Sequence, residues 1–262
     1  MIIMKNLFKV PPVIKNEGFN YLGYHSYSEY NYLQKSYITT VKKRHFEIAL
    51  DLTSEYYYKA NVIDFGCADG IFLPSLSNYF CSVVGIERNE KFVFIAQKLI
   101  DELNLKNVKI INNRDTTIQA IKEECPGDKY KIIFLLEVLE HVGNNFKTMY
   151  DDRITLLKEL FLLVEDDGII VISVPKMVGL SFLIQQIGLS LLNMTRSEYT
   201  LRELLMCSLL KDTSEVEKDW VPEFTHKGFN HEKFEEFMSR EFLIKRKVVD
   251  VFQVVYVIGK RN

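Results

Sequence analysis

One short segment of the 262-residue chain concentrates side chains that can move a proton or bind a metal ion. Glu137, Glu140 and His141 stand at positions i, i+3 and i+4, so a helix that begins here would place them on one side. Two carboxylates and an imidazole are ligands that suit Mg²⁺, Mn²⁺ and Zn²⁺. Without a metal ion, His141 could act as a general base.

A loop of small residues is the second place where we expect chemistry. Gly66, Ala68 and Gly70 follow the apolar run 61–65. Small residues let the backbone turn sharply and let a ligand approach the main chain, and a helix after the loop would offer free N–H groups to a polar ligand. Because the spacing is not G-x-G-x-x-G, a nicotinamide-dependent oxidoreductase is disfavoured.

Short apolar runs that alternate with amphipathic stretches predict the elements that hold these two segments. The expected strands cover residues 61–65, 82–86, 108–111, 131–136 and 169–174. The expected helices include 92–103 and 154–164, and Gly168 is expected to stop the second of them. Strands that are apolar on both faces and separated by helices predict an α/β fold with a mostly parallel sheet and helices on both faces.

The final two apolar runs differ from the others in their spacing. Residues 242–249 and 252–258 are too close in sequence for a helical crossover, so we expect an antiparallel C-terminal strand pair. The whole chain, 1–262, is expected to form a single domain. Two stretches lie outside the alternation, namely a tyrosine-rich N-terminal segment (1–45), expected to be helical, and an insertion (176–224).

The most apolar part of the insertion, residues 177–192, is only 16 residues long and contains four polar side chains. A membrane-spanning helix needs about 20 predominantly apolar residues, so spanning is not expected. Three roles stay open: a lid over an acceptor pocket, a homodimer face, and an amphipathic helix in peripheral contact with a membrane. Trp220 is expected to pack under the insertion.

The composition limits the class of protein. Hydrophobic residues make up 47% and charged residues 26%, which is usual for a globular protein. Lys and Arg number 33 against 35 Asp and Glu, a net charge of −2, so we expect no bulk attraction to nucleic acid. Four scattered cysteines without a C-x-x-C pair and an N-terminus unlike a secretory signal favour a cytoplasmic protein.

The stretch 62–175 resembles the class I S-adenosylmethionine (SAM)-dependent methyltransferases. Their first motif reads acid-x-Gly-x-Gly-x-Gly; Asp64, Gly66 and Gly70 match it, and Ala68 replaces the middle glycine. Glu87 stands where the family places the acid that holds both ribose hydroxyls, and the resemblance implies a Rossmann-like seven-stranded sheet. The residues implied to bind SAM are Asp64, Gly66, Cys67, Ala68, Gly70, Glu87, Arg88, Asp115 and Glu137.

The segment 137–142 is similar to the Glu-x-x-Glu-His run of ubiquinone-biosynthesis O-methyltransferases and small-RNA 2′-O-methyltransferases. The resemblance implies that His141 and Glu140 are catalytic. The RNA enzymes use this run and a later histidine to bind a metal ion, and His226 is the matching histidine here. Whether Glu137, Glu140, His141 and His226 hold a divalent metal ion, or His141 only lines the acceptor pocket, stays open.

The resemblance implies an enzyme that moves a methyl group from SAM to an acceptor heteroatom, with oxygen preferred and with a small-molecule or lipid-like substrate. The sequence carries no Asn-Pro-Pro-Tyr-like run after residue 136, which disfavours the amino-group methylases of DNA bases and glutamine. The alternatives are a SAM-binding relative without catalysis and a metal-assisted RNA 2′-O-methyltransferase. Because the family inserts substrate-recognition elements after the fifth strand, a lid is the preferred role for residues 176–224.

Overall fold

The computed structural model of the protein describes residues 6–14, 21–33, 37–113, 118–124, 129–191, 199–221 and 226–261. The chain forms two compact units. Unit 1 consists of Met1–Leu136 and Glu159–Val171, and unit 2 consists of Glu137–Lys158 and Ile172–Asn262. The expected single domain, with boundaries at residues 45, 176 and 224, stays a prediction.

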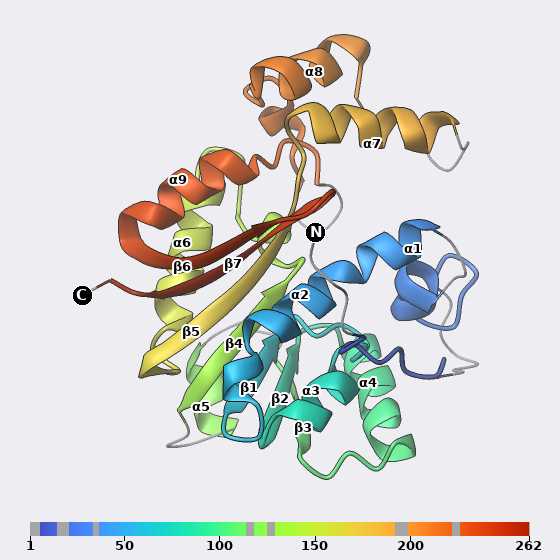
Figure 1. Cartoon of the computed structure of the whole chain (residues 1–262), viewed down its shortest axis with the longest axis vertical. Coiled ribbons are helices and arrows are strands. Elements are labelled where there is room, and N and C mark those ends of the chain that lie inside the picture. Colours follow the sequence, from blue (N-terminus) through green and yellow to red (C-terminus); the bar gives the residue numbers. More distant parts are fainter. Residues whose placement is uncertain are drawn as a thin grey trace. The chain divides into compact units, whose positions relative to one another are not determined.

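The described residues form a seven-stranded sheet with the order β3-β2-β1-β4-β5-β7-β6 (Figure 1). The strands are β1 (Asn61–Phe65), β2 (Ser82–Glu87), β3 (Val108–Asn112), β4 (Tyr130–Leu136), β5 (Val164–Pro175), β6 (Phe242–Val249) and β7 (Gln253–Lys260). β1 pairs in parallel with β2 and β4, and β2 with β3, whereas β6 and β7 are antiparallel. The predicted mostly parallel sheet with an antiparallel C-terminal pair is confirmed.

The strands β1, β2 and β4 of unit 1 are buried on both faces, whereas the edge strand β3 is partly exposed. In β1, all four residues from Val62 to Phe65 are buried, and successive side chains of a strand point to opposite faces, so both faces must be covered. The covering helices are α2 (Arg44–Leu52), α3 (Leu73–Tyr79), α4 (Glu90–Glu102) and α5 (Ile118–Glu124). In α4, four residues of one stripe are buried, as the apolar spacing predicts: Ile95, Ala96, Leu99 and Ile100.

The described part of the N-terminal segment is partly helical. It contains η1 (Glu29–Leu33), a π-helical turn, and α1 (Tyr37–Lys42), whereas residues 6–14 form neither helix nor strand. Those residues are tied to α2, because the Glu47 carboxylate accepts hydrogen bonds from the backbone N–H groups of Leu7 and Phe8, each at 2.9 Å.

Unit 2 carries the insertion and its own apolar core. Its helical elements are η3 (Leu139–His141), most of α6 (Met149–Leu160), α7 (Leu180–Leu191), α8 (Leu201–Leu205), η4 (Met206–Leu210), η5 (Val216–Asp219) and α9 (His231–Glu241). Val178, Phe182, Tyr199, Cys207 and Val216 form one buried cluster. Among the described residues, no helix is long and apolar enough to cross a membrane.

The predicted role of Gly168 is wrong. α6 ends at Leu160, and β5 already begins at Val164, so Gly168 lies inside the strand instead of stopping a helix. A side-chain Cβ at Gly168 would lie 2.9 Å from the backbone oxygen of Lys131 and closer still to Val164. The residue is therefore small because the backbone passes very close to its neighbours.

Candidate active site

The loop after β1 has the backbone conformation that small residues permit. Gly66, Ala68 and Gly70 have φ angles of 77°, 47° and 86°, all in the left-handed region that favours glycine. A Cβ at Gly70 would lie 3.1 Å from the Ala96 Cβ of α4, so the third position also needs its missing side chain for close packing. The loop thus turns sharply away from the sheet at the carboxyl end of β1.

Glu87 ends β2 and holds this loop in place. Its carboxylate accepts hydrogen bonds from the backbone N–H groups of Ala68 at 3.0 Å, Arg88 at 2.9 Å and Asn89 at 2.8 Å. Because β1 and β2 are parallel neighbours, their carboxyl ends lie at one edge of the sheet. The acid and the small-residue loop therefore meet at that edge, as the sequence predicts.

Two further carboxyl groups are buried beside the loop. Burial, reinforced by the negative charge of Glu87, raises the pKa of Asp64 to about 7. The Asp69 carboxylate accepts hydrogen bonds from the backbone N–H of Ser28 at 2.7 Å and from the Ser28 hydroxyl. Asp69 was not among the expected site residues, yet it ties the loop to the tyrosine-rich N-terminal segment.

The other residues expected at the cofactor site differ in their surroundings. Cys67 is buried, and this burial raises the pKa of its thiol well above the usual value. Arg88 is exposed. Asp115 lies outside the described residues.

Residues 137–141 do not form the α-helix that would place Glu137, Glu140 and His141 on one side. Glu137 has a φ of 58°, and only Leu139–His141 form a single 3₁₀ turn. Ser173 explains the break: its backbone oxygen and Oγ accept from the Glu137 N–H at 3.1 and 3.0 Å, and its hydroxyl donates to Glu137 Oε1 at 2.9 Å. A residue held at left-handed φ cannot begin a helix, so Glu137 does not share a face with Glu140.

The structure nevertheless brings Glu140, His141 and His226 together within unit 2. Each offers one possible ligand atom, and these atoms lie within 4.8 Å of one another. His226 Nδ1 is 3.7 Å from Glu140 Oε1, and the ring centroids of His141 and His226 are 4.6 Å apart. Glu137 is not part of this group.

The Glu140 carboxyl group is in an unusual environment. Its side chain is 0% exposed, and neither oxygen has a hydrogen-bond partner among the described residues. Burial raises its pKa well above the usual range, and the Glu137 charge adds to this effect while the Arg153 guanidinium opposes it. Such a carboxyl group has oxygens available to a proton, a hydroxyl group or a cation.

The backbone around Glu140 is held by two residues that the sequence did not single out for the site. Arg153 Nε donates to the Leu139 oxygen at 2.7 Å, and Arg153 Nη2 and Trp220 Nε1 donate to the Glu140 oxygen at 3.2 and 3.1 Å. One sequence signal existed, because Arg153 interrupts the apolar stripe of α6 beside Ile154.

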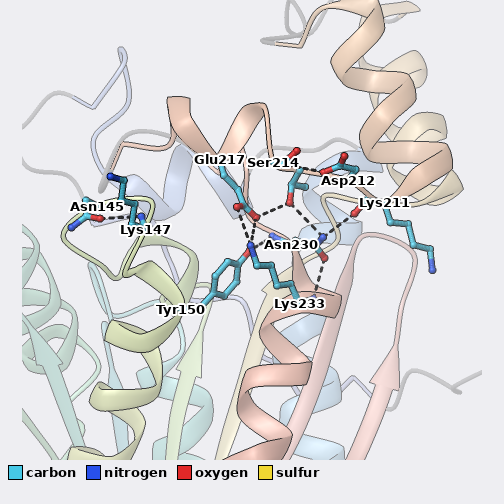
Figure 2. Close-up of polar contacts among 10 residues, drawn as sticks. Asn145, Lys147, Tyr150, Lys211, Asp212, Ser214, Glu217, Asn230 and Lys233 are labelled. Atoms are coloured by element: carbon cyan, nitrogen blue, oxygen red, sulfur yellow. Dashed lines mark hydrogen bonds and ion pairs between the residues drawn. The ribbon is translucent and has the colours of Figure 1, made fainter.

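The segment that carries His226 is anchored by a second network (Figure 2). The backbone N–H of Asn230 donates to the Tyr150 hydroxyl at 3.0 Å, and the Asn230 side chain caps α9 through the N–H groups of Glu232 and Lys233. Lys233 donates to both oxygens of Glu217 at 3.0 Å. These contacts fix the start of α9 at its N-cap, Asn230, which is four residues after His226.

Residues 39–236 match the family model of the methyltransferase domain. Because this match covers most of the chain, the chain belongs to the methyltransferase-domain family. The protein is therefore of the SAM-dependent methyltransferase class. The seven-stranded Rossmann-like sheet agrees with this assignment.

Individual relatives are more distant. The chain is 26% identical over 160 residues to a ubiquinone biosynthesis O-methyltransferase of Actinobacillus pleuropneumoniae serotype 5b, covering 60% of this chain and 58% of that protein. It is 28% identical over 176 residues to the protein of the same name from Glaesserella parasuis, covering 66% and 64%. The chain thus spans about three fifths of the length of these relatives.

Solved structures share the fold at low sequence identity. A SAM-dependent methyltransferase from Aquifex aeolicus superposes with a TM-score of 0.51 at 15% identity, covering 83% of this chain and 92% of that one. An N-methyltransferase from Bradyrhizobium japonicum WM9 in complex with S-adenosyl-L-homocysteine gives a TM-score of 0.53 at 10% identity, covering 88% and 91%. These likenesses establish the Rossmann-like methyltransferase fold.

Proposed function

We propose that the protein transfers a methyl group from SAM to an oxygen atom of a small, lipid-like organic acceptor. The family supports SAM as the donor, and the relatives named O-methyltransferases support oxygen as the acceptor atom. When bound, SAM supplies an electrophilic methyl group on a positively charged sulfur. The chain must then bind the donor, orient the acceptor and remove the acceptor proton.

The donor side of this proposal lies in unit 1. The loop after β1 offers close approach to its backbone at Gly66 and Gly70, and Glu87 offers a carboxylate beside it. Three backbone N–H groups already occupy most of the about four acceptor positions of that carboxylate. A ribose diol would therefore share Glu87 with the loop, so cofactor binding and loop conformation are coupled.

The acceptor side lies in unit 2, and one observation carries it: the buried Glu140 carboxyl group beside two imidazoles. Neither Glu140 oxygen has a hydrogen-bond partner among the described residues, and His226 Nδ1 is 3.7 Å from one of them. An acceptor hydroxyl can donate to Glu140 or His141 and lose its proton there as the oxygen attacks the methyl group. Removing that proton is the general-base role expected of these residues.

The same cluster fits a divalent metal ion, which is the second candidate for its chemistry. Glu140, His141 and His226 supply one carboxylate oxygen and two imidazole nitrogens, and the buried, unsatisfied Glu140 oxygens suit a cation. A bound ion would lower the pKa of an acceptor hydroxyl. Glu137 is less suited as a ligand, because its carboxylate accepts from Ser173 at 2.9 Å.

The insertion is proposed to contact the apolar part of the acceptor as a lid. In α7, Phe182 is buried, whereas Leu180, Ile184 and Ile187 are 63%, 69% and 48% exposed at positions i, i+4 and i+7. Side chains at this spacing form one apolar stripe on a helix. Peripheral membrane contact and a homodimer face are the competing roles for this stripe, and a cytoplasmic location stays a prediction.

The test is transfer of isotopically labelled methyl from SAM to matched acceptors. An alkyl-tailed phenol and the corresponding aniline differ only in the attacking atom, and an RNA with a free 3′-terminal diol represents the metal-assisted alternative. We expect label in the phenol and release of S-adenosylhomocysteine, with little label in the aniline. Label in the RNA alone would favour the alternative, and SAM binding without transfer to any acceptor would identify a non-catalytic relative.

A chelator separates the two candidate roles of the cluster. If His141 and Glu140 act directly, EDTA leaves methyl transfer unchanged. If they hold a metal ion, EDTA abolishes transfer, and Mn²⁺ or Zn²⁺ restores it while SAM affinity stays constant.

A further inference from the structure

The backbone oxygen of Glu140 lies where three elements of unit 2 meet. Trp220, directly after η5, donates to it at 3.1 Å, and Arg153 of α6 donates at 3.2 Å. Arg153 also donates to the neighbouring oxygen of Leu139 at 2.7 Å. The short turn that carries Glu140 and His141 is therefore fixed from outside by side-chain donors.

The turn has little of its own to hold it. Leu139–His141 form a single 3₁₀ turn, whose backbone bonds are those from His141 to Val138 at 3.0 Å and from Val142 to Leu139 at 3.1 Å. Such turns have poorer hydrogen-bond geometry than an α-helix. External donors are thus the stronger restraint on the direction in which the Glu140 side chain leaves the backbone.

Arg153 is itself held rigidly in a place where a cation is unfavourable. Its side chain is fully buried, and its guanidinium carbon lies 4.8 Å from the ring centroid of Phe229, 5.0 Å from that of Tyr150 and 5.4 Å from that of Trp220. Aromatic faces and hydrogen bonds partly offset the cost of burying a charge. Because three aromatic rings surround the guanidinium, it has few alternative orientations.

The same helix also anchors the segment that carries His226. The Tyr150 hydroxyl accepts from the Asn230 N–H at 3.0 Å (Figure 2). Gly228, between His226 and Asn230, has a φ of 87°, and a Cβ there would lie 2.7 Å from the Cα of Glu217, so the segment packs closely against η5. One face of α6 therefore contacts both segments of the Glu140–His141–His226 cluster.

We infer that Arg153 and Trp220 are positioning residues for methyl transfer, which fix the Glu140–His141 turn through the backbone oxygen of Glu140. The inference deepens the proposed function and rests on it for the identity of the cluster as the acceptor site. Trp220 also belongs to the insertion, so it links the insertion to the turn by a single hydrogen bond.

The first test uses Trp220→Phe, which removes the N–H donor and keeps an aromatic ring against Arg153. Tyr57→Phe is the matched control, because it removes the hydroxyl that donates to the Leu50 oxygen at 2.7 Å in unit 1. Imidazole ¹H–¹⁵N spectra resolve the five histidines of the chain. We expect the His141 and His226 signals to shift in Trp220→Phe and to stay fixed in Tyr57→Phe.

The second test is kinetic. Trp220→Phe should lower kcat about tenfold, as the loss of one hydrogen bond allows. The Kd for SAM should change by less than about twofold, which is well below the tenfold change that corresponds to about 1.4 kcal/mol. Arg153→Lys keeps the charge but cannot bridge the oxygens of both Leu139 and Glu140, so it should show the same pattern more strongly. The control Tyr57→Phe should keep the kcat of the wild-type protein, even if it lowers the melting temperature as much as Trp220→Phe does.

The outcomes separate the inference from the proposed function. Unshifted His141 and His226 signals in both Trp220→Phe and Arg153→Lys would overturn the positioning role, whatever the activity. If the wild-type protein methylates no acceptor of the phenol, aniline and RNA panel, the proposed function fails, and shifted imidazole signals would then show only that Arg153 and Trp220 fix the Glu140–His141 turn.

Discussion

The two candidate sites of the protein satisfy their carboxyl groups in opposite ways. At the loop after β1 in unit 1, Glu87 accepts hydrogen bonds from three backbone N–H groups, and Asp69 accepts hydrogen bonds from the N–H and the hydroxyl of Ser28. At the Glu140–His141–His226 cluster of unit 2, Glu140 is fully buried, but its backbone oxygen accepts the hydrogen bonds from Arg153 and Trp220, and its carboxyl group accepts none from the described residues. The first arrangement builds a rigid shape, and the second keeps a reactive group available.

The contrast predicts that Glu140→Gln has the largest effect. We expect methyl transfer to fall by about 10² to 10⁴, the range for loss of a general base, with SAM affinity unchanged by calorimetry. Glu47→Gln is the control, since Glu47 is a buried carboxylate that accepts from Leu7 and Phe8 far from either cluster in sequence. Transfer that survives Glu140→Gln would mean that the unsatisfied carboxyl group is not catalytic.

Glu87→Gln should show the reverse pattern. The variant loses charge-assisted hydrogen bonds to the loop and to a ribose diol, so SAM binding should weaken by about 1.5–3 kcal/mol. At saturating SAM, kcat should recover. Glu90→Gln, an exposed change at the start of α4, provides the comparison. Equal affinities of the two variants would remove Glu87 from the cofactor site.

Asp64 should make the stability of the cofactor side depend on pH. Its folded pKa, about 7, lies above the value of 3.8 for an exposed aspartate, so the folded state binds the extra proton. The resulting stability is fully present below pH 3.8 and is lost as the pH rises through 7. Without SAM, the free energy of unfolding should fall by about 1.4 kcal/mol between pH 6 and pH 8.

The matched variant for that measurement is Asp64→Asn. It removes the ionisable group, so the decline between about pH 6 and pH 8 should flatten. Denaturant titrations of both proteins at each pH measure the difference. An unchanged slope would mean that Asp64 is not the group that titrates.

Ile184→Ser should have the smallest effect and asks whether the acceptor side extends to α7. Because Ile184 is 69% exposed, the change should leave stability within about 0.5 kcal/mol. If the stripe contacts the acceptor, KM should rise about fivefold, for roughly 1 kcal/mol of lost apolar contact. Leu162→Ser, 56% exposed in unit 1, is the control. Phe182 is unsuitable here, because it belongs to the buried cluster of unit 2.

Vesicle binding and sedimentation of the Ile184→Ser variant decide between the competing roles of the stripe. A KM effect without loss of vesicle binding or of dimers supports the lid. Loss of vesicle binding or of dimers with an unchanged KM would contradict it.

The sequence predicts the central sheet well because the runs that form β1, β2 and β4 are apolar on both faces, a pattern typical of a covered parallel sheet. The strand ends at Phe65 and Glu87 follow from that pattern, and so does their meeting at one edge. Local spacing fails at Glu137, because the tertiary contact with Ser173, 36 residues away, overrides the helical phase. Likewise, the pairing of Trp220 with Glu140 joins residues 80 apart, which no local pattern encodes.

The backbone conformation at Ala68, the middle position of the loop after β1, limits which residues this position can carry. Ala68 has a φ of 47°, a conformation that costs a residue with a Cβ about 1–2 kcal/mol. Glycine would remove that strain but would leave the unfolded chain more conformational freedom, which lowers stability by about 0.4–1 kcal/mol. The strain equals or exceeds the entropic term, so glycine is favoured by between about 0 and 1.6 kcal/mol. Ala68→Gly should therefore leave the stability of the loop unchanged or raise it, whereas a residue larger than alanine would keep the strain and lose the close approach to the backbone.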